Sequence, residues 1–153
     1  MHETEVVEAK IEHCGILADA LEQPAADFIR LGWYVEPLSG LLSAFRCSSL
    51  MRRTVFLDGQ IIAMFGCAPG SMVGTGSPWL VTAPGMEKVK LRFIRQSREY
   101  IREMLGLYPV LTAKVYRGNK PLIGWMAWSG FEFADEDEIF IRGELKSWDC
   151  RWF

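Results

Sequence analysis

The sequence has only two histidines, and its four cysteines lie far apart. His2 and His13 are both near the N-terminus, so a zinc site would have to recruit distant cysteines without the paired spacing of known zinc sites. The cysteines show neither CxxC spacing nor the framework of a disulfide-rich secreted protein, which predicts reduced thiols. We therefore expect no metal site. The cysteines are Cys14, Cys47, Cys67 and Cys150.

Long hydrophobic runs and an excess of charge of one sign are also missing. No apolar stretch reaches membrane-spanning length, and residues 1–10 are polar and acidic where a signal peptide would be basic and then apolar. The formal net charge of −2 gives no long-range attraction for nucleic acid or anionic lipid. These absences predict a protein that acts in the cytoplasm or inside a particle assembled there.

No repeat or linker divides the 153 residues, so we expect a single domain over 1–153. Its first part, to about residue 50, has helical patterning. Apolar residues from Ile16 to Leu21 recur at helical spacing, and Pro24 is expected to end that run. A second helix is expected from about Pro37 to Cys47, because proline is tolerated in a first turn and apolar residues follow at helical intervals.

Strand patterns follow. Arg53–Leu57 and Gln60–Phe65 flank Asp58-Gly59, a dipeptide that supplies the positive φ angles of a two-residue hairpin turn. Both segments are apolar on both faces, which favours a sheet covered by helices on two sides. A third strand is expected over Pro78–Thr82.

The longest helix is expected from Met86 to about Leu105, ended by Gly106. A strand over Val110–Tyr116 and a helix over Lys120–Ser129 should come next, with Asn119 as its N-cap and Gly130 at its C-terminal end. Short strands over Phe131–Phe133 and Glu138–Arg142 complete the expected elements, and residues 143–153 form a tail.

One group of residues resembles a known family. Val115-Tyr116, Asn119, Trp125 and Gly130-Phe131 are similar to the strand, asparagine, helix and Gly-Phe of the GCN5-related N-acetyltransferases (GNAT). The resemblance implies an α/β (α+β) fold with a central mixed sheet, helices on both faces, and the sheet and phosphate-side helix over about 51–142.

A narrower resemblance covers nearly the whole chain. The two-helix N-terminal part, the hairpin over 52–59 and the Trp79–Thr82 strand look like a phage branch of that superfamily, which includes internal virion proteins of short-tailed phages. This resemblance implies a role in virion assembly or genome delivery, with protein partners in a virion or assembly complex.

The GNAT resemblance also implies a site for acetyl-CoA. Its pyrophosphate would lie at the start of the long helix, where helix dipole and unpaired N–H groups favour an anion. The corresponding positions are Val81, Thr82, Gly85 and Met86, with Asn119 nearby. The loop departs from the family pattern, because it lacks a second small residue, Pro84 has no N–H, and Glu87 adds a carboxylate that would repel phosphate.

Tyr116 matches the tyrosine that protonates the departing thiolate in the family, and its alternative role is packing at a strand end. The third strand offers no carboxylate as a base. Positive charges along the long helix, from Lys88 to Arg102, fit either a solvated face or contact with nucleic acid or a partner's acidic surface. The aromatics of Trp148–Phe153 fit either a docking tail or a cover for the sheet edge.

Two functions remain open on these residues. The chain is either a GNAT-like scaffold without turnover, which explains the altered phosphate loop and needs no cofactor, or an acetyl-CoA-dependent N-acyltransferase. The acyltransferase reading explains Tyr116 and the retained fold, and its acceptor is an amine of a small molecule or a protein.

Overall fold

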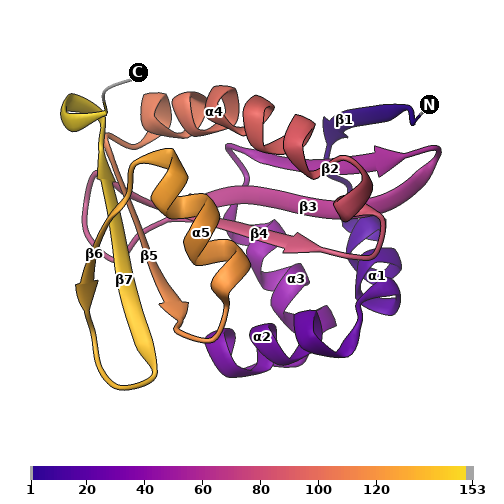
Figure 1. Ribbon diagram of the computed structural model, residues 1–153, viewed down its shortest axis with the longest axis horizontal. Helices are drawn as coiled ribbons and strands as arrows, with labels where there is room; N and C mark the ends of the chain where they lie inside the picture. The colour runs from indigo at the N-terminus through magenta and orange to yellow at the C-terminus, as the bar shows by residue number, and fades with distance from the viewer. Residues whose placement is uncertain (1, 151–153) are drawn as a thin grey trace.

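A seven-stranded mixed sheet lies between two layers of helices in the computed structural model, which describes residues 2–150 (Figure 1). The strand order is β1-β2-β3-β4-β5-β7-β6. This architecture confirms the expected fold class. The strands are β1 (Thr4–Glu8), β2 (Arg52–Leu57), β3 (Gln60–Pro69), β4 (Thr75–Thr82), β5 (Val110–Tyr116), β6 (Glu132–Asp135) and β7 (Phe140–Lys146), and the helices are α1 (Ile11–Ala20), α2 (Gln23–Trp33), α3 (Pro37–Cys47), α4 (Lys90–Leu107) and α5 (Lys120–Ser129).

The hairpin turn is formed as expected. Asp58 and Gly59 have φ angles of 49° and 83°, so both occupy the left-handed region that a two-residue hairpin loop requires. Asp58 also accepts a hydrogen bond from the backbone N–H of Glu3, at 2.9 Å, which attaches the start of the chain to this turn. β5 and α5 also have the expected bounds.

Two N-terminal elements were missed. β1 pairs antiparallel with β2 at the sheet edge, and it is only partly buried, which explains its weak apolar alternation. The run expected to end at Pro24 is α1, which already ends at Ala20, and Pro24 begins another helix. It occupies the first turn of α2, where its missing N–H costs no intrahelical hydrogen bond.

Several expected boundaries were also wrong. A 3₁₀ turn over Met86–Lys88 precedes α4, so the long helix begins at Lys90, and Gly106 lies inside its last turn rather than after it. β4 begins at Thr75 rather than Pro78. The tail expected from residue 143 begins inside β7, and a 3₁₀ turn over Ser147–Asp149 follows that strand. Trp152 and Phe153 lie outside the described residues.

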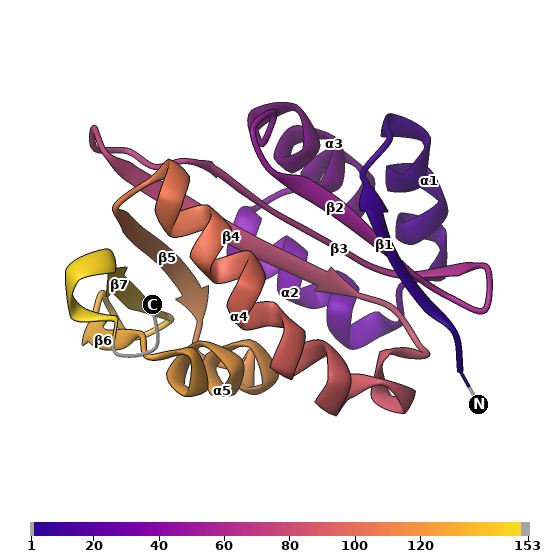
Figure 2. The ribbon, with the colours of Figure 1, turned by 90° about the horizontal axis from the view of Figure 1, so that it is seen from above.

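The sheet separates two hydrophobic clusters (Figure 2). On one face, α1, α2 and α3 pack through residues such as Leu17, Ile29 and Leu41. On the other face, α4 and α5 pack through residues such as Ile101 and Met126. Hydrophobic residues on both sides of β3 serve both clusters, which explains why its sequence is apolar without alternation. The four cysteines are free thiols.

α4 connects β4 to its parallel neighbour β5. The two strands pair only at Thr75–Val110 and Gly76–Leu111. The next residue of β4 in phase with Gly76 is Pro78, which has no N–H to give to a neighbouring strand. The ladder therefore stops there, and the C-terminal ends of the two strands are free to separate.

His13 generates a prediction about pH. Its Nδ1 atom accepts the backbone N–H of Lys10, at 3.1 Å, and lies 2.8 Å from the hydroxyl of Thr54 in the core. Burial lowers the pKa of His13 below its ordinary value, because the charged ring would lose hydration. The folded state thus binds fewer protons than the unfolded state at this residue, and stability must fall as the pH drops through about 6.5.

We expect the free energy of unfolding, measured by urea denaturation, to decrease between pH 7.5 and pH 5.5. The decrease should be smaller in His13→Gln, whose side chain does not titrate. Carboxyl groups titrate at lower pH and contribute little in this window. An equal decrease in both proteins would show that His13 is not the group responsible.

Candidate functional site

The separation of β4 from β5 leaves backbone groups of β4 without a strand partner. Ala83 donates its N–H to the carbonyl of Ile62, and Thr75 accepts the N–H of Gly70, both at 2.8 Å, so these two residues face β3. Backbone direction alternates along an antiparallel pair. Leu80 and Thr82 therefore direct their N–H and C=O groups toward the opening.

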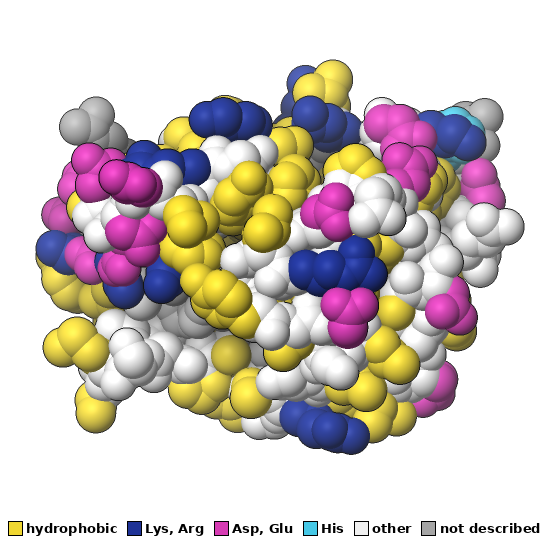
Figure 3. Space-filling view, turned by 90° about the horizontal axis from the view of Figure 1, so that it is seen from below, with side chains coloured by type: hydrophobic (Ala, Val, Ile, Leu, Met, Phe, Trp, Pro, Cys, Tyr) yellow, Lys and Arg dark blue, Asp and Glu magenta, His cyan; other side chains and the backbone are white. Residues whose placement is uncertain are grey.

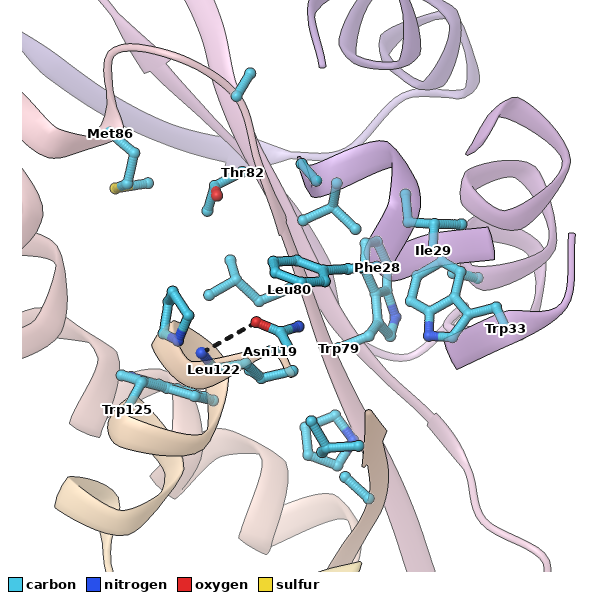
Figure 4. Close-up of a pocket in the computed structure, with 18 of the residues that line it drawn as sticks. Phe28, Ile29, Trp33, Trp79, Leu80, Thr82, Met86, Asn119, Leu122 and Trp125 are labelled. Carbon is cyan, nitrogen blue, oxygen red and sulfur yellow. Dashed lines mark hydrogen bonds between the residues drawn. The ribbon is translucent and has the colours of Figure 1, made fainter. Parts of the chain in front are cut away.

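A cavity of about 1180 Å³ occupies this opening. It is lined by residues of α2 and α3 on one face of the sheet and by residues of α4 and α5 on the other, with β4 and β5 between them (Figure 4). Seen from the side of α2, hydrophobic side chains gather on the hollowed surface (Figure 3). The cavity thus joins the two faces of the sheet, which elsewhere are sealed from each other by paired strands.

The α2 side of the cavity has an aromatic wall formed by Phe28, Trp33 and Trp79 (Figure 4). The rings of Trp33 and Trp79 meet edge to face, with centroids 6.4 Å apart. Trp79 donates its indole N–H to the buried hydroxyl of Ser48, at 2.8 Å, which fixes the ring. A Cβ at Gly40 would lie 2.7 Å from the Trp33 ring, so glycine at this position lets α3 approach it closely.

Asn119 supplies a polar group at the start of α5. Its side-chain oxygen accepts the backbone N–H of Leu122, at 3.4 Å, which confirms the expected N-cap. Asn119 also lines the cavity, together with Thr82 of β4 and Lys114 of β5. The cavity therefore combines an apolar aromatic half with a more polar region where β5 turns into α5.

The loop before α4 already holds an anion, the side chain of Glu87. Gly85 adopts a left-handed conformation, with φ 112°, and donates its N–H to Glu87 Oε2 at 2.9 Å. Hydrogen bonds from the backbone N–H groups of Glu87 itself and of Gly85 lower the pKa of this carboxyl, so it is ionised at neutral pH. Glu87 thus accepts the hydrogen bond from the Gly85 N–H, the group that the family resemblance assigned to a cofactor phosphate.

Tyr116 lies outside this cavity. Its ring contacts Phe28, with centroids 6.2 Å apart, and covers the backbone of Gly118, where an added Cβ would lie 2.3 Å from the ring. Glycine at position 118 therefore makes room for the tyrosine. The assigned role of Tyr116 in protonating a thiolate stays a prediction.

The structure brings together four of the six site residues expected from sequence. Val81, Thr82, Met86 and Asn119 line the cavity, whereas Gly85 and Tyr116 do not. Sequence reasoning missed the aromatic wall, because two of its residues belong to α2, which was not predicted. The amphipathic spacing of Ile29 and Trp33 was the available signal.

Three features were not found in the described residues. Among residues 2–150, no group of three His, Cys, Asp or Glu side chains is placed to hold a metal ion. Within the same residues, no helix has the length and apolar character needed to cross a membrane. β4 carries no carboxylate, so the cavity has no acidic base on that strand.

Comparison with protein-family models found no match, and neither did comparison with curated proteins. Solved structures do match. A GNAT-family acetyltransferase from Streptococcus pneumoniae is 12% identical, with a TM-score of 0.65 and coverage of 94% of this chain and 99% of that chain. A GNAT-family acetyltransferase from Bacillus anthracis is 8% identical, with a TM-score of 0.68 and coverage of 95% and 96%.

A third match is the PaiA N-acetyltransferase from Thermoplasma acidophilum, solved in complex with coenzyme A. It is 16% identical, with a TM-score of 0.64 and coverage of 94% of this chain and 99% of that chain. None of these three comparisons concerns a phage protein. At such low identity the likeness extends to the fold and no further, and on that basis the chain has the GNAT acetyltransferase fold.

Proposed function

We propose that this protein is an N-acyltransferase that takes its acyl group from a pantetheine thioester, the reactive part of acetyl-CoA. The observation that carries the proposal is the cavity that crosses the sheet where β4 and β5 separate. Such a passage lets a donor enter from one face and an acceptor from the other, so that the two reacting groups meet between the strands. The three solved GNAT acetyltransferases support this assignment through their shared fold.

The β4 edge suits the donor. A pantetheine arm is an extended chain with two amides, and such a chain can pair with unpaired strand backbone as an added strand does. Leu80 and Thr82 present their N–H and C=O groups for this pairing. Val81 and Met86 would then contact the arm through apolar surface, and Asn119 lies across the opening.

Transfer of the acyl group from sulfur to nitrogen needs no reagent besides the thioester and the amine. The amine nitrogen attacks the thioester carbonyl, the C–N bond forms, and the C–S bond breaks. The thiolate leaves, and the proton lost by the nitrogen passes to it through water or a side chain. Holding both reactants in one cavity supplies the positional part of the rate enhancement.

The aromatic wall indicates which amines the cavity would accept. A charged ammonium cannot attack, and β4 has no carboxylate to deprotonate it; the carboxylates that line the cavity are Glu87, held by Gly85, and Glu22 before α2. Burial against Phe28, Trp33 and Trp79 disfavours the charged form and lowers the pKa of an entering amine. We therefore expect acceptors with an apolar group beside a weakly basic nitrogen, such as aromatic amines.

A second candidate function is favoured by Glu87 and by the position of Tyr116. A GNAT-like scaffold in a virion or other assembly needs neither a free phosphate site nor an acid beside the thiolate. Its cavity would bind no thioester, and its surfaces would contact protein partners. Absence of donor binding in the experiment below favours this candidate.

Leu80→Pro tests the donor site. The substitution removes a backbone N–H that faces the opening, while the ladder to β3 keeps its hydrogen bonds. We expect the Kd for S-acetyl-pantetheine, measured by calorimetric titration, to rise about fivefold relative to Leu80→Ala, because one hydrogen bond contributes about 1 kcal/mol. Leu80→Ala is the matched control for the lost side chain, and thermal unfolding monitors folding of both. If both variants fold and bind S-acetyl-pantetheine with equal affinity, the β4 edge is not part of the donor site.

Tyr116→Phe tests the acid assigned from sequence. Because the tyrosine packs on Phe28 outside the cavity, we expect thiol release from S-acetyl-pantetheine, with aniline as acceptor, to continue at a rate within about twofold of the unmodified protein, with little change in stability. If the variant folds normally yet loses transfer, Tyr116 is the acid after all and must reach the cavity when substrates bind.

A further inference from the structure

We infer that the acyl donor is a pantetheine thioester carried on an acidic protein, rather than free acetyl-CoA. The inference rests on the proposed function and concerns the part of the donor beyond the pantetheine arm. Free acetyl-CoA continues from the arm into a pyrophosphate and a nucleotide. A carrier protein instead attaches the same arm to a serine through a single phosphodiester, which has less charge to place at the entrance.

The first observation is that the loop before α4 has little to offer a pyrophosphate. Glu87 holds the N–H of Gly85 at 2.9 Å, and Pro84 has no N–H to offer. A pyrophosphate at this position would have to displace an ionised carboxylate or lie against it. Like charges in contact repel each other even at a solvated surface.

The second observation is the surface around the same entrance. The cavity is lined there by Lys90 and Leu91 from the start of α4 and by Lys120 from the start of α5, all of them exposed. Lys88 and Arg95 are exposed in or beside the same part of α4. We call these five residues the entrance surface.

The entrance surface is basic on a chain whose formal net charge is −2. Within the described part of the chain, neither Lys90 nor Arg95 forms a salt bridge, so their charges are available to a partner. Leu91 keeps 70% of its surface exposed among them. Exposed cations around an apolar side chain complement a protein with an acidic surface, because charge guides the encounter and the apolar contact is buried on binding.

These two observations select the same donor. A carrier protein would dock on the entrance surface, and its arm would pass between α4 and α5 to the β4 edge, with Lys90 and Lys120 beside the phosphodiester. No phosphate would need the backbone donor held by Glu87. The sequence did not decide whether the basic face of α4 is a solvated surface or a binding site for a partner. In this arrangement the face would bind the carrier protein.

The experiment compares three donors by calorimetric titration: S-acetyl-pantetheine, acetyl-CoA, and an acyl carrier protein loaded with acetyl-phosphopantetheine. We expect the carrier-borne donor to bind at least about tenfold more tightly than S-acetyl-pantetheine, and acetyl-CoA to bind no more tightly than S-acetyl-pantetheine. Glu87→Gln should increase affinity for acetyl-CoA by about tenfold relative to S-acetyl-pantetheine. Glu99→Gln, which changes an exposed carboxylate farther along α4, is the matched control and should not.

Charge reversal in Lys90→Glu and Arg95→Glu should weaken binding of the carrier-borne donor at least about fivefold more than binding of S-acetyl-pantetheine. Thermal unfolding confirms that both variants fold. If acetyl-CoA binds the unmodified protein more tightly than S-acetyl-pantetheine, or if the charge reversals affect both donors equally, the inference is overturned while the proposed function stands. If S-acetyl-pantetheine itself fails to bind, the proposed function fails as well.

Discussion

Pro78 lies where β4 and β5 separate, and the candidate site depends on that separation. The residue keeps its place in the pairing of β4 with β3, because that pairing does not require its missing N–H. On the side of β5 the same absence ends the ladder two residues after Gly76. The unpaired backbone of Leu80 and Thr82 and the cavity that joins the two faces of the sheet lie beyond this point.

Each face of the sheet then contributes its own chemistry to the opening. On the α2 side, α2 lies across the separated strands, with Phe28 touching Tyr116 of β5 and Trp33 touching Trp79 of β4. On the α4 side, the carboxylate of Glu87 lies on the N–H of Gly85, and Lys90 and Lys120 also line the cavity. The apolar half therefore offers burial to a molecule in the cavity, and the loop half offers charge.

The sequence predicted those parts of the fold that local signals specify. Asp58-Gly59 between two apolar runs specifies a two-residue hairpin turn, and the hairpin was predicted correctly. Asn119 and Gly130 cap the two ends of α5, so the bounds of this helix were also predicted correctly. Pro24 misled because proline stops a helix from within but is favoured in a first turn. β1 was missed because an edge strand buries too little to need a strong pattern.

The candidate site was less predictable, since it depends on contacts between distant segments. Val81, Thr82, Met86 and Asn119 were identified because a family resemblance placed them, whereas Phe28 and Trp33 belong to an element that the sequence did not reveal. The sequence already showed that Glu87 places a carboxylate in the loop that the resemblance assigns to the cofactor phosphates. Only the structure shows that its carboxylate folds back onto the N–H of Gly85.

An opening made by backbone has a consequence for how such a protein diverges. The groups offered by Leu80 and Thr82 are N–H and C=O, which every residue except proline provides, so nearly any side chain can replace these two without closing the gap. The opening therefore requires few particular side chains along this part of β4. An opening built from backbone is thus compatible with a fold that this chain shares with three solved structures at only 8–16% identity.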